Sequence, residues 1–169
     1  MLIIIIIFVV FINQSKLYTN KLVIAEYPQI TYISHLEYAT HIENGYTEED
    51  LYWLSKIVMA ETFYDTDEGQ QAVANVVLNR VSSSGFPDSI YEVVWQKTGE
   101  TWQFSPCGDG GIHREPDERA FENAKVILEG KRVLPEDILF FYMPTKSNKS
   151  NWIRSRKVYK KIGVHNFCY

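Results

Sequence analysis

Glu61 is the residue whose position most clearly suggests chemistry. It lies in the stretch "WLSKIVMAETFYD", where Leu51, Leu54 and Val58 recur at spacings of three and four residues, as expected for one buried helical face. The next step of three in that series falls on Glu61. Burial disfavours the charged form of a carboxyl group and raises its pKa. Glu61 is therefore a candidate proton donor for cleavage of a glycosidic bond, the alternative being an acid that points into water from a helix end.

Other catalytic chemistries find less support in the sequence. A zinc site needs three protein ligands, commonly histidines with a carboxylate or a thiolate. The four histidines at 35, 41, 113 and 165 form no HExxH motif and no close pair on one predicted helix. No GxSxG motif is present, and Cys107 lies in a predicted loop without an adjacent histidine, so a nucleophilic serine or cysteine is also disfavoured. We therefore predict no metal and no cofactor.

Several aromatic and basic side chains are candidates for substrate contact. Trp102 and Trp152 are favoured because polar residues surround them, although most aromatic rings in proteins belong to the core. Arg154 and Arg156 are two apart and would share one face of a strand, from which they could bind carboxylates; a solvated basic edge is the alternative. The full set of predicted substrate contacts is Trp102, Phe104, Asp109, Tyr142, Trp152, Arg154 and Arg156.

The elements that must position these residues are mostly helical. Thr47 and Asp50 fit a variant capping box, which predicts that the Glu61 helix begins there. A second helix is predicted from about Glu68 to Ser82, with Asp67 as its cap. Further helices are predicted over 88–96 and 117–129, an irregular loop over 98–116, a strand in "ILFFYM", and a last strand or hairpin in the tail.

Length and composition indicate one folded domain with a separate N-terminal segment. The chain of 169 residues has 46% apolar and 22% charged residues, which is ordinary globular usage. Residues 1–12 are all apolar and are interpreted as a signal-like or membrane-anchoring segment, and 13–46 as an arm or linker. The domain is expected over 47–169. Its two cysteines, Cys107 and Cys168, either pair or remain buried thiols.

Charge is distributed unevenly along the chain. Residues 138–169 carry 7 basic and no acidic residues, whereas all 21 acidic residues precede them. Such a basic end attracts polyanions of any kind, the anionic bacterial cell wall included.

Four segments, taken in order and with their spacing, carry a family resemblance. They are "AETFYDTDEGQQAVANVVLNRV", "FPDSIYEVVWQ", "QFSPCGDGGI" and "FFYMPTKSNKSNWIRSRKVYKKIGVHNFCY". Together they resemble the SleB-type cell-wall hydrolases known from spore-cortex lysis, over about Leu51 to Tyr169. The resemblance implies a mainly α (α+β), lysozyme-like catalytic domain with a small C-terminal β element.

The resemblance also implies an activity. The family's catalytic glutamate falls on Glu61, which would cleave peptidoglycan glycan strands between N-acetylmuramic acid and N-acetylglucosamine, as in a lytic transglycosylase. If water attacks instead, a second acid such as Asp109 could assist. The expected partner is peptidoglycan rather than nucleic acid, and the expected location is extracytoplasmic.

The chain differs from members of this family in two ways, and two alternative functions remain open. Relatives commonly read "GEARGE" where this chain has "AETFYD", so the rim of the cleft beside Glu61 should differ. The export signal and wall-binding repeat of relatives are reduced here to a short apolar start and an arm. The alternative functions are an N-acetylmuramoyl-L-alanine amidase, which would normally need zinc, and a non-catalytic wall-binding module.

Overall fold

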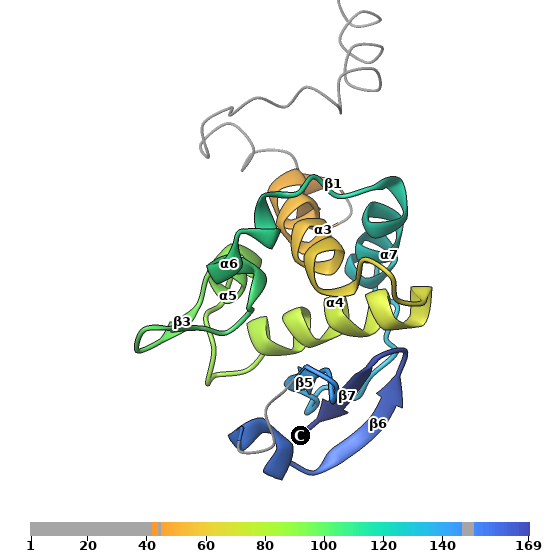
Figure 1. Cartoon of the computed structure of the whole chain (residues 1–169). Coiled ribbons are helices and arrows are strands. Elements are labelled where there is room, and N and C mark those ends of the chain that lie inside the picture. The colour runs from red at the N-terminus through yellow and green to blue at the C-terminus, as the bar shows by residue number, and fades with distance from the viewer. Residues whose placement is uncertain (1–41, 44, 147–150) are drawn as a thin grey trace, which may run out of the picture. The chain divides into compact units, whose positions relative to one another are not determined.

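The computed structural model describes residues 42, 43, 45–146 and 151–169. The predictions for residues 1–12 and for most of the arm lie outside these residues. The described part begins with a short antiparallel ladder of β1 (Ile42–Glu43) and β2 (Tyr46–Thr47), at the end of the predicted arm. The remaining elements are α3 (Glu48–Thr62), α4 (Asp67–Val81), α5 (Ile90–Val94), β3 (Lys97–Thr98), β4 (Thr101–Trp102), α6 (Pro106–Asp109), η2 (Gly111–His113), α7 (Glu118–Leu128), β5 (Phe140–Tyr142), η3 (Trp152–Ser155), β6 (Val158–Ile162) and β7 (His165–Cys168) (Figure 1).

Helix α3 begins where the sequence predicts. The Asp50 amide donates to Thr47 Oγ1 at 3.0 Å, and the Thr47 amide donates to Asp50 Oδ2 at 2.9 Å, which completes the capping box. Leu54 and Val58 are fully buried, so the apolar face that leads to Glu61 packs into the core.

Helix α4 begins one residue earlier than predicted, and its cap is a different residue. Thr66, not Asp67, precedes the helix, and its hydroxyl accepts from the Gly69 amide at 3.1 Å. Asp67 becomes the first helical residue, where its negative charge suits the helix dipole. Val73, Val76 and Val77 are fully buried, so one face of α4 packs into the core. Helices α3, α4 and α7 pack against one another and form most of the core.

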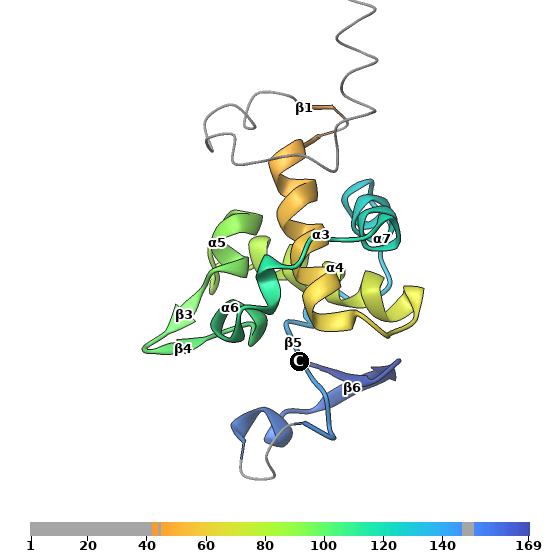
Figure 2. The ribbon, with the colours of Figure 1, turned by 45° about the horizontal axis from the view of Figure 1, so that its top comes forward.

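The segment predicted as an irregular loop contains short regular elements. Strands β3 and β4 form a hairpin that projects beyond α5 and α6 (Figure 2). Pro106 occupies the first position of α6, where its fixed φ suits a helix start. Gly110, with a φ of 86°, ends α6 and introduces η2, because glycine adopts left-handed φ at little cost. Short helices of this kind carry too few periodic apolar positions to be recognised from sequence.

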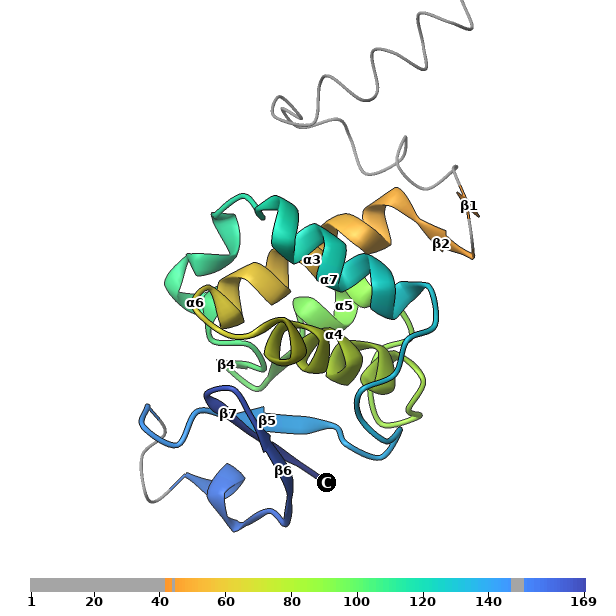
Figure 3. The same ribbon diagram turned by 90° about the vertical axis from the view of Figure 1, so that its right-hand side faces the viewer.

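The C-terminal tail forms the predicted hairpin and extends it to a sheet. Strand β7 pairs antiparallel with both β5 and β6, in the order β5-β7-β6. The sheet lies on the opposite side of α4 from α3 and α7 in two perpendicular views (Figures 1 and 3). The mainly helical α+β fold with a small C-terminal sheet is therefore confirmed.

Polar side chains of α4 hold the extended segment that leads into β5. Asn75 Oδ1 accepts from the amides of residues 133 and 134 at 2.8 and 3.0 Å. Asn79 Nδ2 donates to the carbonyls of residues 135 and 138 at 2.8 and 3.0 Å. Arg80 Nε donates to the Leu139 carbonyl at 2.8 Å. Buried backbone groups need such partners, so α4 fixes where β5 begins.

The two cysteines remain separate thiols. Cys107 and Cys168 are both free and buried, so the predicted alternative of a disulfide between them is wrong. Cys107 Sγ donates to the Val94 carbonyl at 3.2 Å, and burial raises the pKa of this thiol to about 12. Within the described residues, no helix has the length and apolar character needed to span a membrane.

Candidate active site

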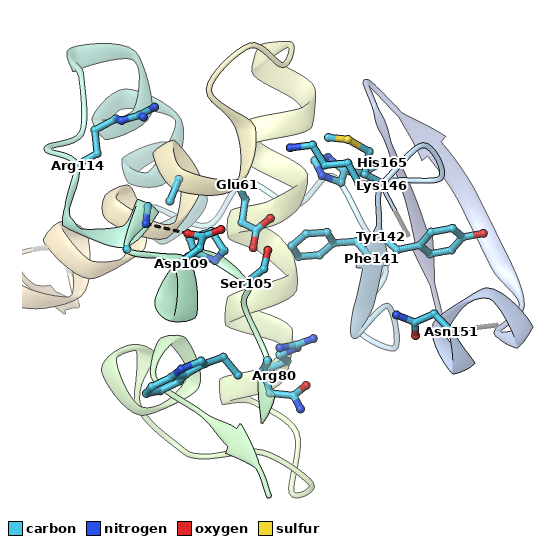
Figure 4. A pocket seen from close by; sticks show the side chains of 17 residues that line it. Glu61, Arg80, Ser105, Asp109, Arg114, Phe141, Tyr142, Lys146, Asn151 and His165 are labelled. Carbon is cyan, nitrogen blue, oxygen red and sulfur yellow. Dashed lines mark hydrogen bonds between the residues drawn. The ribbon is translucent and has the colours of Figure 1, made fainter. Parts of the chain in front are cut away.

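A pocket of about 750 Å³ opens between the helices and the sheet. This first pocket has the size of a small-molecule or saccharide site. The C-terminal end of α3, the segment 102–114, and strands β5 and β7 contribute its walls. Its lining includes Glu61, Arg80, Trp102, Gln103, Ser105, Asp109, Arg114, Phe141, Tyr142, Lys146, Asn151 and His165 (Figure 4).

Glu61 projects into the first pocket from the last turn of α3. Figure 4 shows its carboxyl group beside Asp109 and Ser105, with the Phe141 ring nearby. The pKa of Glu61 is raised to about 7, first by burial and then by the negative charge of Asp109, while Lys146 and Arg80 act in the opposite direction. The carboxyl group is thus divided between its acid and base forms near neutral pH, which suits a group that must donate a proton and take one back.

Asp109 is the second carboxylate of the pocket, in a contrasting environment. It ends α6, is exposed, and its Oδ1 accepts from the Gly111 amide at 2.9 Å. This turn directs Asp109 toward the Glu61 side of the pocket (Figure 4).

Arg80 is a pocket residue that the sequence analysis missed. Its side chain is 4% exposed, and its guanidinium carbon lies 4.9 Å from the centre of the Phe104 ring. Burial lowers the pKa of Arg80 to about 10, so it stays charged at neutral pH. Among the residues that the structure describes, Arg80 Nη1 has no hydrogen-bond partner. A buried donor beside a pocket is suited to binding a carbonyl or carboxylate of a ligand.

A second missed group, His165, lies on the sheet side of the pocket. Its Nδ1 is 3.2 Å from Asp65 Oδ2, and both side chains are buried. A carboxylate oxygen can only accept, so Nδ1 carries the proton. Asp65 also accepts from the amides of Thr66 and Val164 at 2.8 and 3.4 Å. Asp65 therefore ties the turn between α3 and α4 to the β6–β7 hairpin.

The sequence offered partial signals for these residues. Asn75, Asn79 and Arg80 form a polar stripe beside the apolar face of α4. Such a stripe alone predicts a solvent-exposed side, whereas the structure buries all three residues. Asp65 falls in the turn where the chain departs from its apparent relatives. No local pattern links it to a histidine one hundred positions away.

The predicted aromatic contacts divide into three groups. Trp102 and Tyr142 line the first pocket, as does the predicted acid Asp109. Phe104 is only 1% exposed, so its ring belongs to the core under Arg80 and not to a ligand surface. Trp152 is 57% exposed and lies at a neighbouring pocket instead.

The two arginines predicted to contact substrate, Arg154 and Arg156, do not lie on a strand. Residues 152–155 form the 3₁₀ helix η3 and Arg156 follows it, so the prediction of a strand with both arginines on one face is wrong. Arg154 Nη1 donates to the Pro144 carbonyl at 2.8 Å, and Arg156 Nη1 donates to the Tyr169 carbonyl at 2.7 Å. Neither is part of the first pocket's lining. Both hold backbone segments in place.

Over residues 42–43, 45–146 and 151–169, no group of three or more His, Cys, Asp or Glu side chains is arranged to hold a metal ion. His35 and His41 lie outside these residues.

A partly buried acid with a raised pKa, beside a second and exposed acid in a polar pocket, suits acid-catalysed cleavage of a glycosidic bond. The chain belongs to the Cell Wall Hydrolase family, whose model matches residues 64–168. Glu61 lies just before the start of that match.

Solved structures with the same fold support this assignment. The catalytic domain of the germination-specific lytic transglycosylase SleB from Bacillus anthracis is 32% identical with a TM-score of 0.65, and the match covers 76% of this chain and 100% of that one. The catalytic domain of the Bacillus cereus SleB protein is 32% identical with a TM-score of 0.64, over 77% and 97% of the two chains. The predicted SleB-type resemblance is thus confirmed.

Curated relatives match this chain over part of their own length, and they are named spore cortex-lytic enzymes. A spore cortex-lytic enzyme of Halalkalibacterium halodurans is 34% identical over 80% of this chain and 39% of the relative. A spore cortex-lytic enzyme of Bacillus subtilis is 33% identical over 77% of this chain and 41% of the relative. The chain therefore spans less than half the length of these relatives.

Proposed function

We propose that this chain degrades peptidoglycan by cleaving its glycan strand between N-acetylmuramic acid and N-acetylglucosamine, as a lytic transglycosylase. The observation that carries the proposal is the Glu61 carboxyl group, which faces the first pocket with a pKa raised to about 7. Membership of the Cell Wall Hydrolase family and similarity to the SleB catalytic domains support the choice of substrate.

In the proposed reaction Glu61 acts twice. As the acid it protonates the bridging oxygen while the anomeric carbon gains positive charge. As the resulting carboxylate it removes the proton of the muramoyl 6-hydroxyl, whose oxygen then bonds to the anomeric carbon. The products are a 1,6-anhydro-muramoyl end and a free N-acetylglucosamine end, and Glu61 has its proton back. No second protein carboxylate is needed, because the nucleophile belongs to the substrate.

Other residues of the pocket have supporting roles in this proposal. Trp102 and Tyr142 contact sugar rings, and Arg80 Nη1 donates to a carbonyl or carboxylate of the muramoyl substituent. The negative charge of Asp109 adds to burial in raising the Glu61 pKa. If water replaced the 6-hydroxyl, Asp109 would be the group to orient it, and hydrolysis would result.

The site of action that fits this chemistry is outside the cytoplasm, where peptidoglycan lies. Relatives named for spore cortex lysis support this location. The membrane tether or signal proposed for residues 1–12 lies outside the described residues.

The experiment that tests the proposal is mass spectrometry of purified peptidoglycan, from spore cortex and from vegetative walls, after digestion with the protein. Anhydro-muramoyl ends support the transglycosylase and reducing muramic acid ends indicate hydrolysis. Released peptides that require a metal ion would establish the amidase instead. An intact sacculus that still binds the protein would establish a wall-binding module.

A further inference from the structure

Arg80 is a buried cation of the first pocket whose charge the protein compensates in part. Its Nε donates to the Leu139 carbonyl at 2.8 Å, but Nη1 has no hydrogen-bond partner among the residues that the structure describes. The guanidinium carbon lies 5.0, 4.9 and 5.6 Å from the ring centres of Phe86, Phe104 and Phe140. These rings offset some of the cost of burying the cation, yet a buried charge needs an opposite charge with matching hydrogen bonds.

The negative charge that acts on Arg80 is that of Glu61. Burial lowers the pKa of Arg80, the Glu61 carboxylate raises it, and the charge of Arg156 lowers it. Glu61 and Arg80 line the same pocket from α3 and α4 (Figure 4). The proposed reaction starts from protonated Glu61, which is neutral and no longer balances the Arg80 charge. The reactive state of the pocket therefore suits an anion that the substrate supplies.

The muramoyl unit carries one such anion close to its sugar ring. Its lactyl carboxyl group is an amide while the stem peptide is attached, and it is a free carboxylate once the peptide has been removed. A carboxylate matches both the charge and the planar donor geometry of a guanidinium. An amide carbonyl accepts a hydrogen bond but leaves the charge uncompensated.

We propose that Arg80 makes this enzyme selective for glycan strands that have lost their stem peptides, by donating from Nη1 to the free lactyl carboxylate of the muramoyl unit. This inference rests on the proposed function and specifies its substrate. The enclosed position of Arg80 supports it, because an amide-linked stem would bring its first amino acid against the rings around the guanidinium. The carboxylates of the stem itself are several bonds further from the sugar, whereas Arg80 is nearly fully buried.

This selectivity gives the reaction a place in a sequence of steps. The free lactyl carboxylate is produced when the amide bond between the lactyl carbonyl and the first amino acid of the stem is hydrolysed. An amidase reaction on the same strand must therefore come before glycan cleavage by this chain.

The test compares three glycan strands of equal sugar length as substrates of the full chain. They are peptide-free strands, the same strands with each lactyl carboxylate converted to its methylamide, and strands that keep their stem peptides. The wild-type kcat/KM should be about tenfold higher for the peptide-free strand than for its methylamide, because a charge-assisted hydrogen bond is roughly twice as strong as a neutral one. The peptide-bearing strand should be cleaved no faster than the methylamide. Equal values for the first two strands, or faster cleavage of the peptide-bearing strand, would overturn the selectivity.

Arg80→Met tests whether Arg80 is the residue responsible, because it removes the charge and the donor but keeps an unbranched side chain. The preference for the carboxylate strand should fall to about one. Arg132→Met is the matched control and should keep the wild-type preference. Arg132 is exposed and lies outside the first pocket, and its Nη1 donates to the Ile127 carbonyl at 2.8 Å. Thermal unfolding shows whether Arg80→Met is folded, and an undiminished preference in the folded variant would overturn the role of Arg80. If Arg80→Met does not fold, the comparison of wild-type substrates decides.

The proposed function can fail separately from this inference. If the wild type cleaves none of the three strands, the proposed glycan cleavage is wrong. Calorimetric binding of the peptide-free strand and of its methylamide then decides on the carboxylate site. Tighter binding of the peptide-free strand by the wild type supports the site, and equal binding or no binding overturns it.

Discussion

The first pocket has two walls that are built in different ways. The helical wall presents Glu61 from α3, an element with its own capping box and a contiguous apolar face. The sheet wall presents Phe141, Tyr142 and His165 (Figure 4), and it is held by hydrogen bonds between residues far apart in sequence. The Asn79 amide reaches Ile138 and Asp65 reaches His165.

The helical wall therefore supplies the reactive group, and the sheet wall supplies the surface against which a substrate would be positioned. The proton donor stands on a helix whose start and apolar face are determined by its local sequence. The sheet wall depends on a few long-range polar contacts, so small changes at those contacts can move the surface that a substrate would meet. Three perturbations, each acting on one of the two walls, are taken from the largest expected effect to the smallest.

Glu61→Gln removes the chemistry of the helical wall and leaves the sheet wall intact. The amide cannot donate the proton, so the rate of peptidoglycan cleavage should fall at least about a thousandfold. Clearing of peptidoglycan in a gel and the release of soluble fragments measure the loss. Glu122→Gln, which changes an exposed acid on α7, should keep full activity. Cleavage by Glu61→Gln at the wild-type rate would remove Glu61 from the mechanism.

Gly163→Ala attacks the sheet wall at its contact with Asp65. Gly163 has a φ of 54°, and an added Cβ would lie 1.7 Å from Asp65 Oδ1. We expect the free energy of unfolding to fall by about 3 kcal/mol or more, from left-handed strain together with the steric clash. Urea denaturation measures this change.

Gly99→Ala is the matched control for that substitution. Gly99 has a φ of 58°, and its added Cβ would meet nothing within 4 Å. It should lose only the strain, about 1 to 2 kcal/mol. Equal losses in the two variants would show that the Asp65 contact does not hold the sheet wall.

Asp109→Asn tests the electrostatics of the helical wall, because it should shift the pH range over which the enzyme is active. Cleavage needs protonated Glu61, so activity should be high below about pH 7 and fall as the pH rises through the Glu61 pKa. The Asp109 charge raises that pKa, so its removal lowers the pKa and moves the fall in activity to lower pH. At neutral pH the loss should be below about tenfold. Asp88→Asn, which alters an exposed acid, should leave the pH profile unchanged; a shift in the opposite direction for Asp109→Asn would contradict the electrostatic account.

The helical wall could largely be predicted from sequence. Leu54, Val58 and Glu61 share one face because helical periodicity is a local property, and the Thr47 cap followed from a four-residue pattern. The cap of α4 was misplaced by one residue because Thr66 and Asp67 are both good caps. Only the backbone geometry distinguishes them.

The sheet wall could be predicted only in outline. A strand near 138–143 and a C-terminal hairpin followed from β-branched and aromatic residues. The roles of Arg80, His165 and Asp65 did not, because each depends on partners more than fifty positions away. The polar residues around Trp152 favoured an exposed ring, and Trp152 is 57% exposed. The burial of Phe104 in the core could not be predicted in this way, because it depends on packing against residues distant in sequence.

The most direct test of the central claim is a titration of the Glu61 side-chain carboxyl carbon by ¹³C NMR, with the resonance assigned from its absence in Glu61→Gln. The account predicts a midpoint near pH 7, since burial and the Asp109 charge both favour the protonated form. A midpoint near the ordinary value of 4.5 would mean that the fold does not keep an acid protonated in the pocket, and would contradict the account.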